Sequence, residues 1–292
     1  MMVRATLFSL LLCPVISFAQ TGGSQTDGNA NFFRGNAPSF ETATGPTVDF
    51  RPEGGATTDH MFGGWWYYRV SGDTRERPFG IYTNSAGGAL AGSSTYTGNT
   101  ATYNWSETDS AAVVRFNAVY TSVLTDGPTP GSATLANTFS ITNPGSVPLV
   151  ISLFNYADFD VNASSGGDSA TGNINSMTIT EGSTSIVFSA ANASAFQVAA
   201  FAAIRDLLLN ANADNLNNSG LPFGPGDFTG AYQWNLTIQP GATVDVQSTW
   251  AISVAVPEPA MLASFGAGIF AAGFGYRRWR SKQKRRVVRS RS

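Results

Sequence analysis

Short runs of alternating apolar and polar residues, separated by clusters of Gly, Asn, Pro and Asp, fill the chain from Met61 to Ser253. Successive side chains of a β-strand point to opposite faces. In "VVRFNAVY" this alternation places one set of side chains on a single face: Val114, Phe116, Ala118 and Tyr120. In "QPGA", Pro240 and Gly241 occupy the two central positions of a tight turn. This pattern predicts an all-β fold, a β-sandwich over residues 57–255.

Two segments depart from that pattern. Apolar residues between 196 and 208 recur near helical spacing, which predicts one short helix over 201–210 that covers an end of the sandwich. Residues 20–56 are rich in Gly, Thr, Asn and Ser with few large apolar side chains. We therefore expect a low-complexity, poorly ordered lead-in there, with one strand near "PTVDF".

The N-terminus has the organisation of a secretory signal peptide. Arg4 precedes an apolar stretch over residues 5–16, and small residues at positions 17 and 19 lead to a cleavage site between Ala19 and Gln20. Residues 1–19 would thus engage the Sec translocon and signal peptidase. Cys13, the only cysteine, leaves with this peptide. The mature chain therefore needs a core large enough to be stable without disulfides.

Charge is divided sharply along the chain. Residues 20–255 carry 18 Asp or Glu, 7 Arg and no Lys, whereas the chain after Tyr276 carries 9 Lys or Arg and no acid. An acidic ectodomain argues against nucleic acid as a partner. Residues 260–276 are uncharged, and a helix of that length measures about 25 Å, the short end of what spans a bilayer.

The basic cluster after this apolar run predicts the membrane topology. Arg277, Arg278 and Arg280 resist translocation, so a transmembrane helix over 260–276 would leave the basic tail, residues 281–292, in the cytoplasm. The ectodomain would then lie outside, the same orientation that the signal peptide implies. Pro257 and Pro259 prevent the helix from extending backwards. From these features alone, an ordinary single-pass anchor with a proline-rich stalk remains an alternative.

The segment "VPEPAMLASFGAGIFAAGFGYRRWR" resembles the PEP-CTERM sorting signal of Gram-negative bacteria. The resemblance covers residues 256–280 and rests on three ordered parts: the Pro-Glu-Pro triplet, an Ala- and Gly-rich span and an Arg-rich end. It implies that Pro257, Glu258 and Pro259 form the recognition motif of exosortase, a membrane-embedded cysteine protease-transpeptidase. It also implies a link to exopolysaccharide and biofilm. The basic tail is longer than that of typical sorting signals.

Acidic residues gather in "NYADFDVNASSGGD". Asp158, Asp160 and Asn162 alternate, and Asp168 follows. Alternating oxygen ligands in a tight loop suit the coordination of Ca²⁺, so these four residues are a candidate calcium site. Ala163 and the missing Glu depart from the EF-hand pattern. The alternative is a strand that ends in an acidic, Gly-rich turn.

Four consecutive aromatic residues are a second candidate site. Trp65 and Tyr67 would face one side of a strand, and Trp66 and Tyr68 the other. One pair would belong to the core, and the other could stack on sugars. The alternative is that all of them pack between sheets. The charged residues that follow predict a local charge network: Arg69, Asp73, Arg75, Glu76 and Arg77.

Catalytic patterns are absent from the sequence. His60, the sole histidine, is expected at the surface or in a loop, and G-x-S-x-G is missing. Metal sites of several His or Cys ligands are excluded. We therefore expect a non-enzymatic exported protein: an inner-membrane precursor first, then a cell-surface or extracellular protein after processing. The alternatives are a carbohydrate-binding or carbohydrate-active protein, in which two carboxylates would suffice for glycoside hydrolysis, and a permanently anchored adhesin or receptor.

Overall fold

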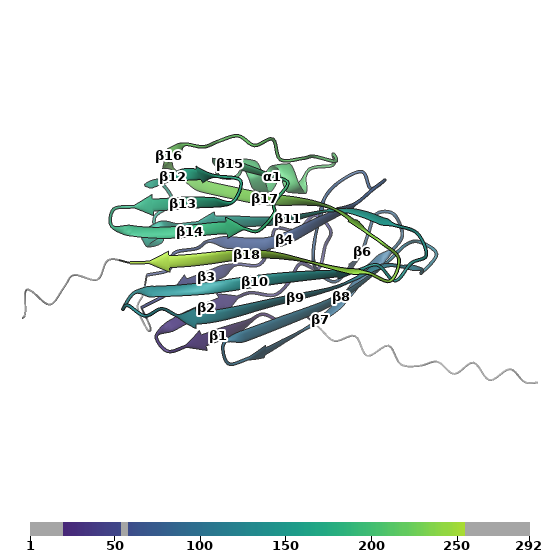
Figure 1. Ribbon diagram of the computed structural model, residues 1–292, viewed down its shortest axis with the longest axis horizontal. Coiled ribbons are helices and arrows are strands. Elements are labelled where there is room, and N and C mark those ends of the chain that lie inside the picture. The colour runs from purple at the N-terminus through teal and green to yellow at the C-terminus, as the bar shows by residue number, and fades with distance from the viewer. Residues whose placement is uncertain (1–19, 54–57, 255–292) are drawn as a thin grey trace, which may run out of the picture. The chain divides into compact units, whose positions relative to one another are not determined.

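The computed structural model describes residues 20–53 and 58–254, which form three antiparallel sheets (Figure 1). The largest has ten strands in the order β16 (Phe223–Gly226), β12 (Asp168–Asn173), β13 (Ser176–Glu181), β14 (Thr184–Ala190), β18 (Thr243–Ser253), β10 (Ser132–Thr142), β9 (Val114–Asp126), β8 (Thr100–Thr108), β7 (Ala89–Thr97) and β6 (Tyr82–Thr83). The second comprises β15 (Ala195–Ala200), β17 (Phe228–Ile238), β11 (Leu149–Phe159), β4 (Gly63–Val70) and β5 (Arg77–Pro78). The third comprises β1 (Gly23–Asp27), β2 (Ala30–Arg34) and β3 (Val48–Arg51).

The ten- and five-stranded sheets pack face to face through aromatic side chains. Trp66 on β4 lies 4.9 Å from Phe139 on β10, measured between ring centroids. Tyr232 on β17 lies 4.7 Å from Phe188 on β14, and its hydroxyl donates to the Phe188 carbonyl oxygen. The predicted all-β sandwich is therefore confirmed for the described residues. Alternation along β9 buries Phe116, Ala118 and Tyr120, as expected.

The expectation of a poorly ordered lead-in is wrong. Residues 20–53 form the three-stranded sheet, which buries Phe32 and Phe50 completely. This sheet packs on the ten-stranded sheet, where Gln25 exchanges hydrogen bonds with Ser122 on β9. A bridge between Thr47 and Gly63 sets it beside the five-stranded sheet. Its few apolar residues suffice because the larger sheet supplies the rest of the core.

The single α-helix among the described residues is α1 (Ala203–Leu209), within the predicted range. Ile204 and Leu208, one turn apart, are buried, and the helix packs on β15 and β17. A one-turn 3₁₀ helix, η1 (Val161–Ala163), follows β11. The predicted turn at Pro240 and Gly241 joins β17 to β18: the Ala242 amide donates to the Gln239 carbonyl oxygen, and Gly241 has a φ of 73°.

β18 lies in the middle of the ten-stranded sheet (Figure 1). It pairs with β10 on one side and with β14 on the other, and both pairings extend to Ser253. The Val254 amide then donates to the Gly131 carbonyl oxygen. The fold is therefore ordered up to the residue that precedes position 255.

Several predictions concern residues outside the described ranges. They are the signal peptide over 1–19, the sorting motif, the transmembrane helix over 260–276 and the basic tail. Within residues 20–53 and 58–254, the structure contains no helix of the length and apolarity that a membrane crossing requires.

Candidate functional site

Three carboxylates meet where two neighbouring interior strands of the five-stranded sheet, β11 and β17, end and begin. Asp158 is the penultimate residue of β11, Asp160 follows that strand, and Asp227 immediately precedes β17. In the β11–β17 register Phe159 lies opposite Phe228, so the next pair along places Asp160 opposite Asp227. One oxygen from each of the three side chains lies within 4.8 Å of the others. We call this group the carboxylate triad.

Two adjoining cavities open beside the carboxylate triad. The larger, of about 250 Å³, is lined by all three carboxylates, Ser165, Phe62 and Phe201. The smaller, of about 170 Å³, shares Asp158, Phe62 and Phe201 with it and extends to Tyr67, Tyr156 and Arg205. Asp158 thus borders both cavities. We call the two cavities together the acidic cleft.

Phe62 and Phe201 flank the triad and remain partly open to solvent. Their side chains are 55% and 41% exposed, and the two rings meet edge to face at 6.0 Å. Each is held by the backbone of a triad residue: the Phe62 amide donates to the Asp158 carbonyl oxygen, and the Phe201 amide to that of Asp227. The fold therefore presents two apolar rings next to three carboxylates, a combination that suits a ligand with both polar and apolar faces.

Burial and mutual repulsion raise the pKa of each triad carboxyl. Burial raises the pKa of Asp158 to about 7, and the charges of Asp160 and Asp227 add to the rise. The pKa of Asp160 rises to about 6, through burial and then through Asp227. Burial also raises the pKa of Asp227. Holding three negative charges together is therefore costly unless a proton or a cation neutralises them.

Hydrogen bonding in the cleft leaves two buried oxygens free. The Tyr156 hydroxyl donates to Asp158 Oδ2 at 3.1 Å, whereas Asp158 Oδ1 is buried and has no hydrogen-bond partner in the part of the chain that the structure describes. The Tyr67 hydroxyl is also buried without one. Buried polar atoms of folded proteins are usually satisfied, so these two atoms indicate that the cleft accommodates water, an ion or a ligand group.

The predicted calcium ligands are only partly brought together. Asp158 and Asp160 lie in the triad, but Asn162 does not. With a φ of 60°, its side chain turns to accept from the Thr184 hydroxyl and to donate to the Glu181 carbonyl oxygen. The Asn162 amide thus holds η1 against β13 and β14.

Asp168 is likewise outside the triad. It begins β12, is fully buried, and has both carboxylate oxygens without a hydrogen-bond partner. Burial, followed by the charges of Glu181 and Asp160, raises its pKa to about 8. The third carboxylate of the cluster is Asp227 and not Asp168. The sequence pattern did not single out Asp227. Its nearness to Asp160 depends on which strand pairs with β11, and no local sequence pattern carries that information.

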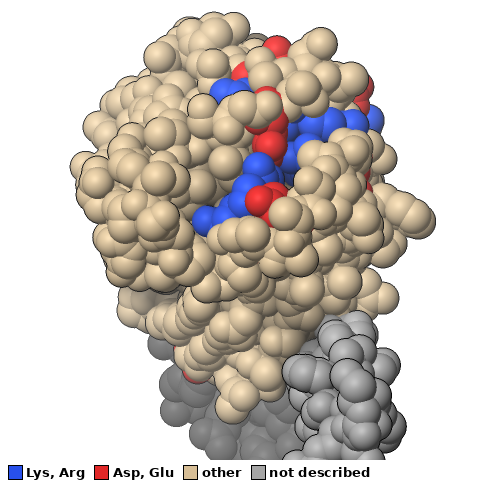
Figure 2. Space-filling model, turned by 90° about the vertical axis from the view of Figure 1, so that its right-hand side faces the viewer, with Lys and Arg blue, Asp and Glu red and all other residues tan. Residues whose placement is uncertain are grey.

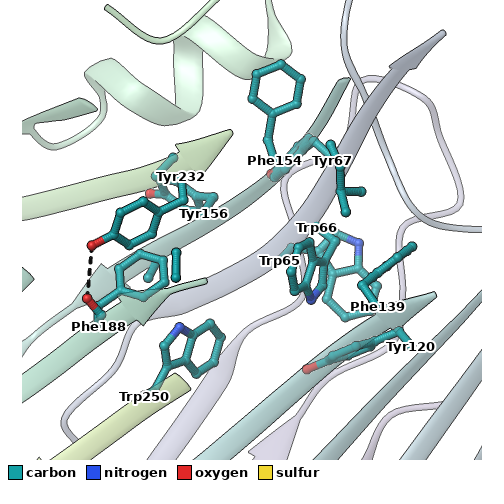
Figure 3. Close-up of a cluster of buried hydrophobic side chains, with 14 of the residues drawn as sticks. Trp65, Trp66, Tyr67, Tyr120, Phe139, Phe154, Tyr156, Phe188, Tyr232 and Trp250 are labelled. Atoms are coloured by element: carbon teal, nitrogen blue, oxygen red, sulfur yellow. Dashed lines mark hydrogen bonds between the residues drawn. The ribbon is translucent and has the colours of Figure 1, made fainter. Parts of the chain in front are cut away.

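The four consecutive aromatics are all in the core, and Figure 3 shows Trp65, Trp66 and Tyr67 among its buried side chains. Trp65, Trp66, Tyr67 and Tyr68 are each at most 1% exposed. Trp66 and Tyr68 contact Phe139 and Phe116 of the ten-stranded sheet. The other pair is covered too, since Trp65 packs on Tyr103 and Tyr67 on Tyr156. Neither pair presents a face to sugars, so the packing alternative describes them and the stacking prediction is wrong.

The predicted charge network after β4 is present and larger than expected. Asp73 accepts from Arg77 at 2.5 Å and from Arg115 at 2.9 Å, and Arg69 pairs with Glu76. Glu41 and Glu107, both distant in sequence, join through Arg77 and Arg115. Figure 2 faces the end of the sandwich where β6 lies and shows side chains of both signs clustered on an otherwise uncharged surface.

His60 lies in a loop, as expected, but it is not at the surface. It is fully buried, and its Nδ1 accepts the Asn162 amide at 3.1 Å. Burial lowers its pKa to about 4. The neutral imidazole thus supports the turn after β11, which places Asp160.

The comparisons with known proteins identify one motif. Residues 255–280 match the family model of the PEP-CTERM protein-sorting motif, so this chain carries a PEP-CTERM sorting signal, as the sequence indicated. No curated protein matches the chain.

Solved structures resemble the chain only distantly. A bacterial glucoamylase complexed with acarbose has a TM-score of 0.48 and 11% identity over 86% of this chain and 34% of its own. A putative aldose 1-epimerase of Escherichia coli K12 has a TM-score of 0.47 and 11% identity over 80% of this chain and 99% of its own. A putative kojibiose phosphorylase from the human microbiome has a TM-score of 0.39 and 9% identity, covering 86% and 32%. The chain thus spans about a third of the glucoamylase, and we draw no conclusion about activity from these similarities.

Proposed function

We propose that this chain is the precursor of an exported, non-enzymatic envelope or matrix protein that exosortase sorts through its C-terminal signal. The PEP-CTERM motif at residues 255–280 is the observation that carries this proposal. The acidic sandwich precedes the motif along the chain, and a basic cluster follows it. In this proposal the sandwich faces the outside, residues 260–276 cross the inner membrane, and Pro257, Glu258 and Pro259 are presented to the enzyme.

The described sheets end before the sorting motif begins, which supports separate roles for the sandwich and the sorting signal. β18 ends at Ser253, and Val254 is still hydrogen-bonded to Gly131. Because both pairings of β18 extend no further than Ser253, removal of the chain beyond Val254 would leave the hydrogen bonds of the described sheets in place. The exported product would then be a folded sandwich that reaches the cell surface or the surrounding polysaccharide.

Mass spectrometry of the mature protein tests the sorting step. In cells that produce exosortase, we expect the mature protein to begin at Gln20 and to lack the chain beyond the Pro-Glu-Pro motif. Replacing Pro257, Glu258 and Pro259 by Ala should retain the full tail. The control is Pro240→Ala, which changes a proline in the β17–β18 turn and should leave processing unchanged. An intact tail on the unmodified protein in exosortase-positive cells would contradict the proposal and favour a permanently anchored adhesin or receptor.

A second candidate function is glycan binding in the acidic cleft. The specific observation is that Phe62 and Phe201 expose apolar rings beside the carboxylate triad, since sugars present C–H faces to aromatic rings and hydroxyls to carboxylates. This role would fit a protein delivered to an exopolysaccharide matrix.

Binding of the exported protein to extracellular polysaccharide from the source cells tests the glycan candidate. Phe62→Ala and Phe201→Ala should each weaken binding, whereas Phe40→Ala, which removes an exposed ring outside the cleft, should not. Equal glycan binding by all three variants would show that the cleft is not the glycan site. Release of reducing sugars by the purified protein would instead show catalysis and overturn the non-enzymatic role.

A further inference from the structure

We propose that the carboxylate triad, Asp158, Asp160 and Asp227, binds one divalent cation, and that the cation is Ca²⁺. This inference is independent of sorting and of glycan binding. It differs from the site expected from sequence, because Asp227 replaces Asn162 and Asp168 as a ligand.

The first argument is geometric. The ligand oxygens of the triad lie within 4.8 Å of one another. Two oxygens on opposite sides of a Ca²⁺ ion are about 4.6–5.2 Å apart, twice its usual bond length, whereas Mg²⁺ requires about 4.0–4.2 Å and near-octahedral order. The three oxygens are therefore close enough together to contact one Ca²⁺ ion.

The second argument is the unsatisfied oxygen of Asp158. This residue is 1% exposed, its Oδ1 has no hydrogen-bond partner, and it lines both cavities of the acidic cleft. The Tyr156 hydroxyl holds the other oxygen and so orients the carboxylate. A bound cation would satisfy Oδ1 directly, and no protein donor in the described chain does so.

The third argument is the distribution of positive charge. Of the seven arginines between residues 20 and 254, Arg69, Arg77 and Arg115 belong to the charge network at β5 and its surroundings. Arg75 donates to the backbone carbonyl oxygens of Glu76 and Leu209. Arg205 reaches the smaller cavity, but its guanidinium is paired with Asp206 at 3.0 Å. Among the described residues, no arginine forms an ion pair with the triad. A metal ion would relieve the repulsion among its carboxylates.

The surroundings select the type of ion. The triad offers only oxygen ligands, which are the donors that hard cations prefer, and no His or Cys within residues 20–53 and 58–254 joins the group. A cavity of about 250 Å³ leaves room for water molecules to complete the coordination shell. Three protein carboxylates in a partly open cleft resemble extracellular calcium modules, for which dissociation constants of about 10⁻⁴–10⁻³ M are typical.

Calorimetric titration of the full chain in detergent with CaCl₂, after EDTA treatment and buffer exchange, tests the proposal. We expect saturable binding of one Ca²⁺ per chain. The melting temperature should rise by roughly 5–10 °C when free Ca²⁺ exceeds the dissociation constant 100-fold. Absence of saturable binding, or a melting temperature that is unchanged by Ca²⁺, would overturn the proposal. An equal response to MgCl₂ would overturn the assignment to Ca²⁺.

Two variants distinguish a ligand role from a structural one. Asp160→Asn and Asp227→Asn should each lower Ca²⁺ affinity tenfold or more, and both should melt at the same or a higher temperature than the unmodified protein in EDTA, because a repulsive charge is removed. Asp245→Asn makes the same change on an exposed part of β18 and should preserve affinity. Unchanged Ca²⁺ affinity in both triad variants would refute the assigned ligands.

Discussion

Replacement of Trp66 by Ala tests whether the four consecutive aromatics are core residues. Trp66 is 1% exposed and reaches three rings: Phe139 at 4.9 Å, Trp234 at 5.6 Å and Tyr120 at 5.9 Å. It therefore joins the five-stranded sheet to the ten-stranded one. Truncation would open a cavity where the two layers meet, because neighbouring rings from both sheets are fixed by their own strands.

The magnitude follows from the buried area. A buried aromatic side chain removes about 150–250 Å² from water, which corresponds to about 4–6 kcal/mol at about 25 cal/mol per Å². Measured losses for Trp→Ala in protein cores are about 3–5 kcal/mol. We expect a loss in this range in the free energy of unfolding, and a fall in melting temperature of roughly 6–20 °C for a domain of this size.

Urea unfolding followed by circular dichroism measures the loss. Phe62→Ala is the matched control, since Phe62 is 55% exposed and its truncation should change the free energy of unfolding by at most about 1 kcal/mol. A loss of less than about 1 kcal/mol for Trp66→Ala would refute the assignment of this ring to the core. It would reopen the interpretation of these aromatics as a sugar-stacking platform.

Three further predictions concern buried polar groups, each measured by thermal unfolding in EDTA. The raised pKa of Asp168, about 8, means that the folded state holds a proton which the unfolded state releases. Stability should therefore fall as pH rises from about 4 to 8, and Asp168→Asn should reduce this fall; an unaltered profile would contradict the assignment. The pKa of His60 is lowered to about 4, so stability should fall as pH drops from about 6.5 to 4, and this slope should be smaller in His60→Gln. Arg115→Ala should cost about 3–5 kcal/mol because it leaves Asp73 and Glu107 buried without this partner, and a cost below 1 kcal/mol would argue against the network as a structural element.

The strands were predictable because their signal is local. Alternation in β9 and the turn at Pro240 and Gly241 can be read from a few consecutive residues, and both are present in the structure. The lead-in was misjudged because its sheet depends on distant partners. Phe32 packs against Trp250 on β18, and a sparse pattern of apolar residues does not reveal such a partner.

Only the part of the candidate site that depends on local sequence, Asp158 and Asp160, could be predicted. Asp158 and Asp160 are two residues apart at the end of β11, so the alternation of the sequence predicted that they would lie on a common side. Asp227 joins them only through the pairing of β11 with β17, which is a property of the assembled sheet. The burial of both faces of β4, with Trp65 and Trp66 each covered, likewise depends on the layers that surround that strand.

The central position of β18 has a mechanical consequence. Its register with β10 includes 11 residue pairs and that with β14 includes 6, and the strand leads directly towards the sorting motif. A pulling force applied through the C-terminal segment would therefore load both ladders in shear along the strand, so that many hydrogen bonds must break together. Tethered at that end, the sandwich would resist unfolding under flow better than if an edge strand with a single ladder carried the attachment.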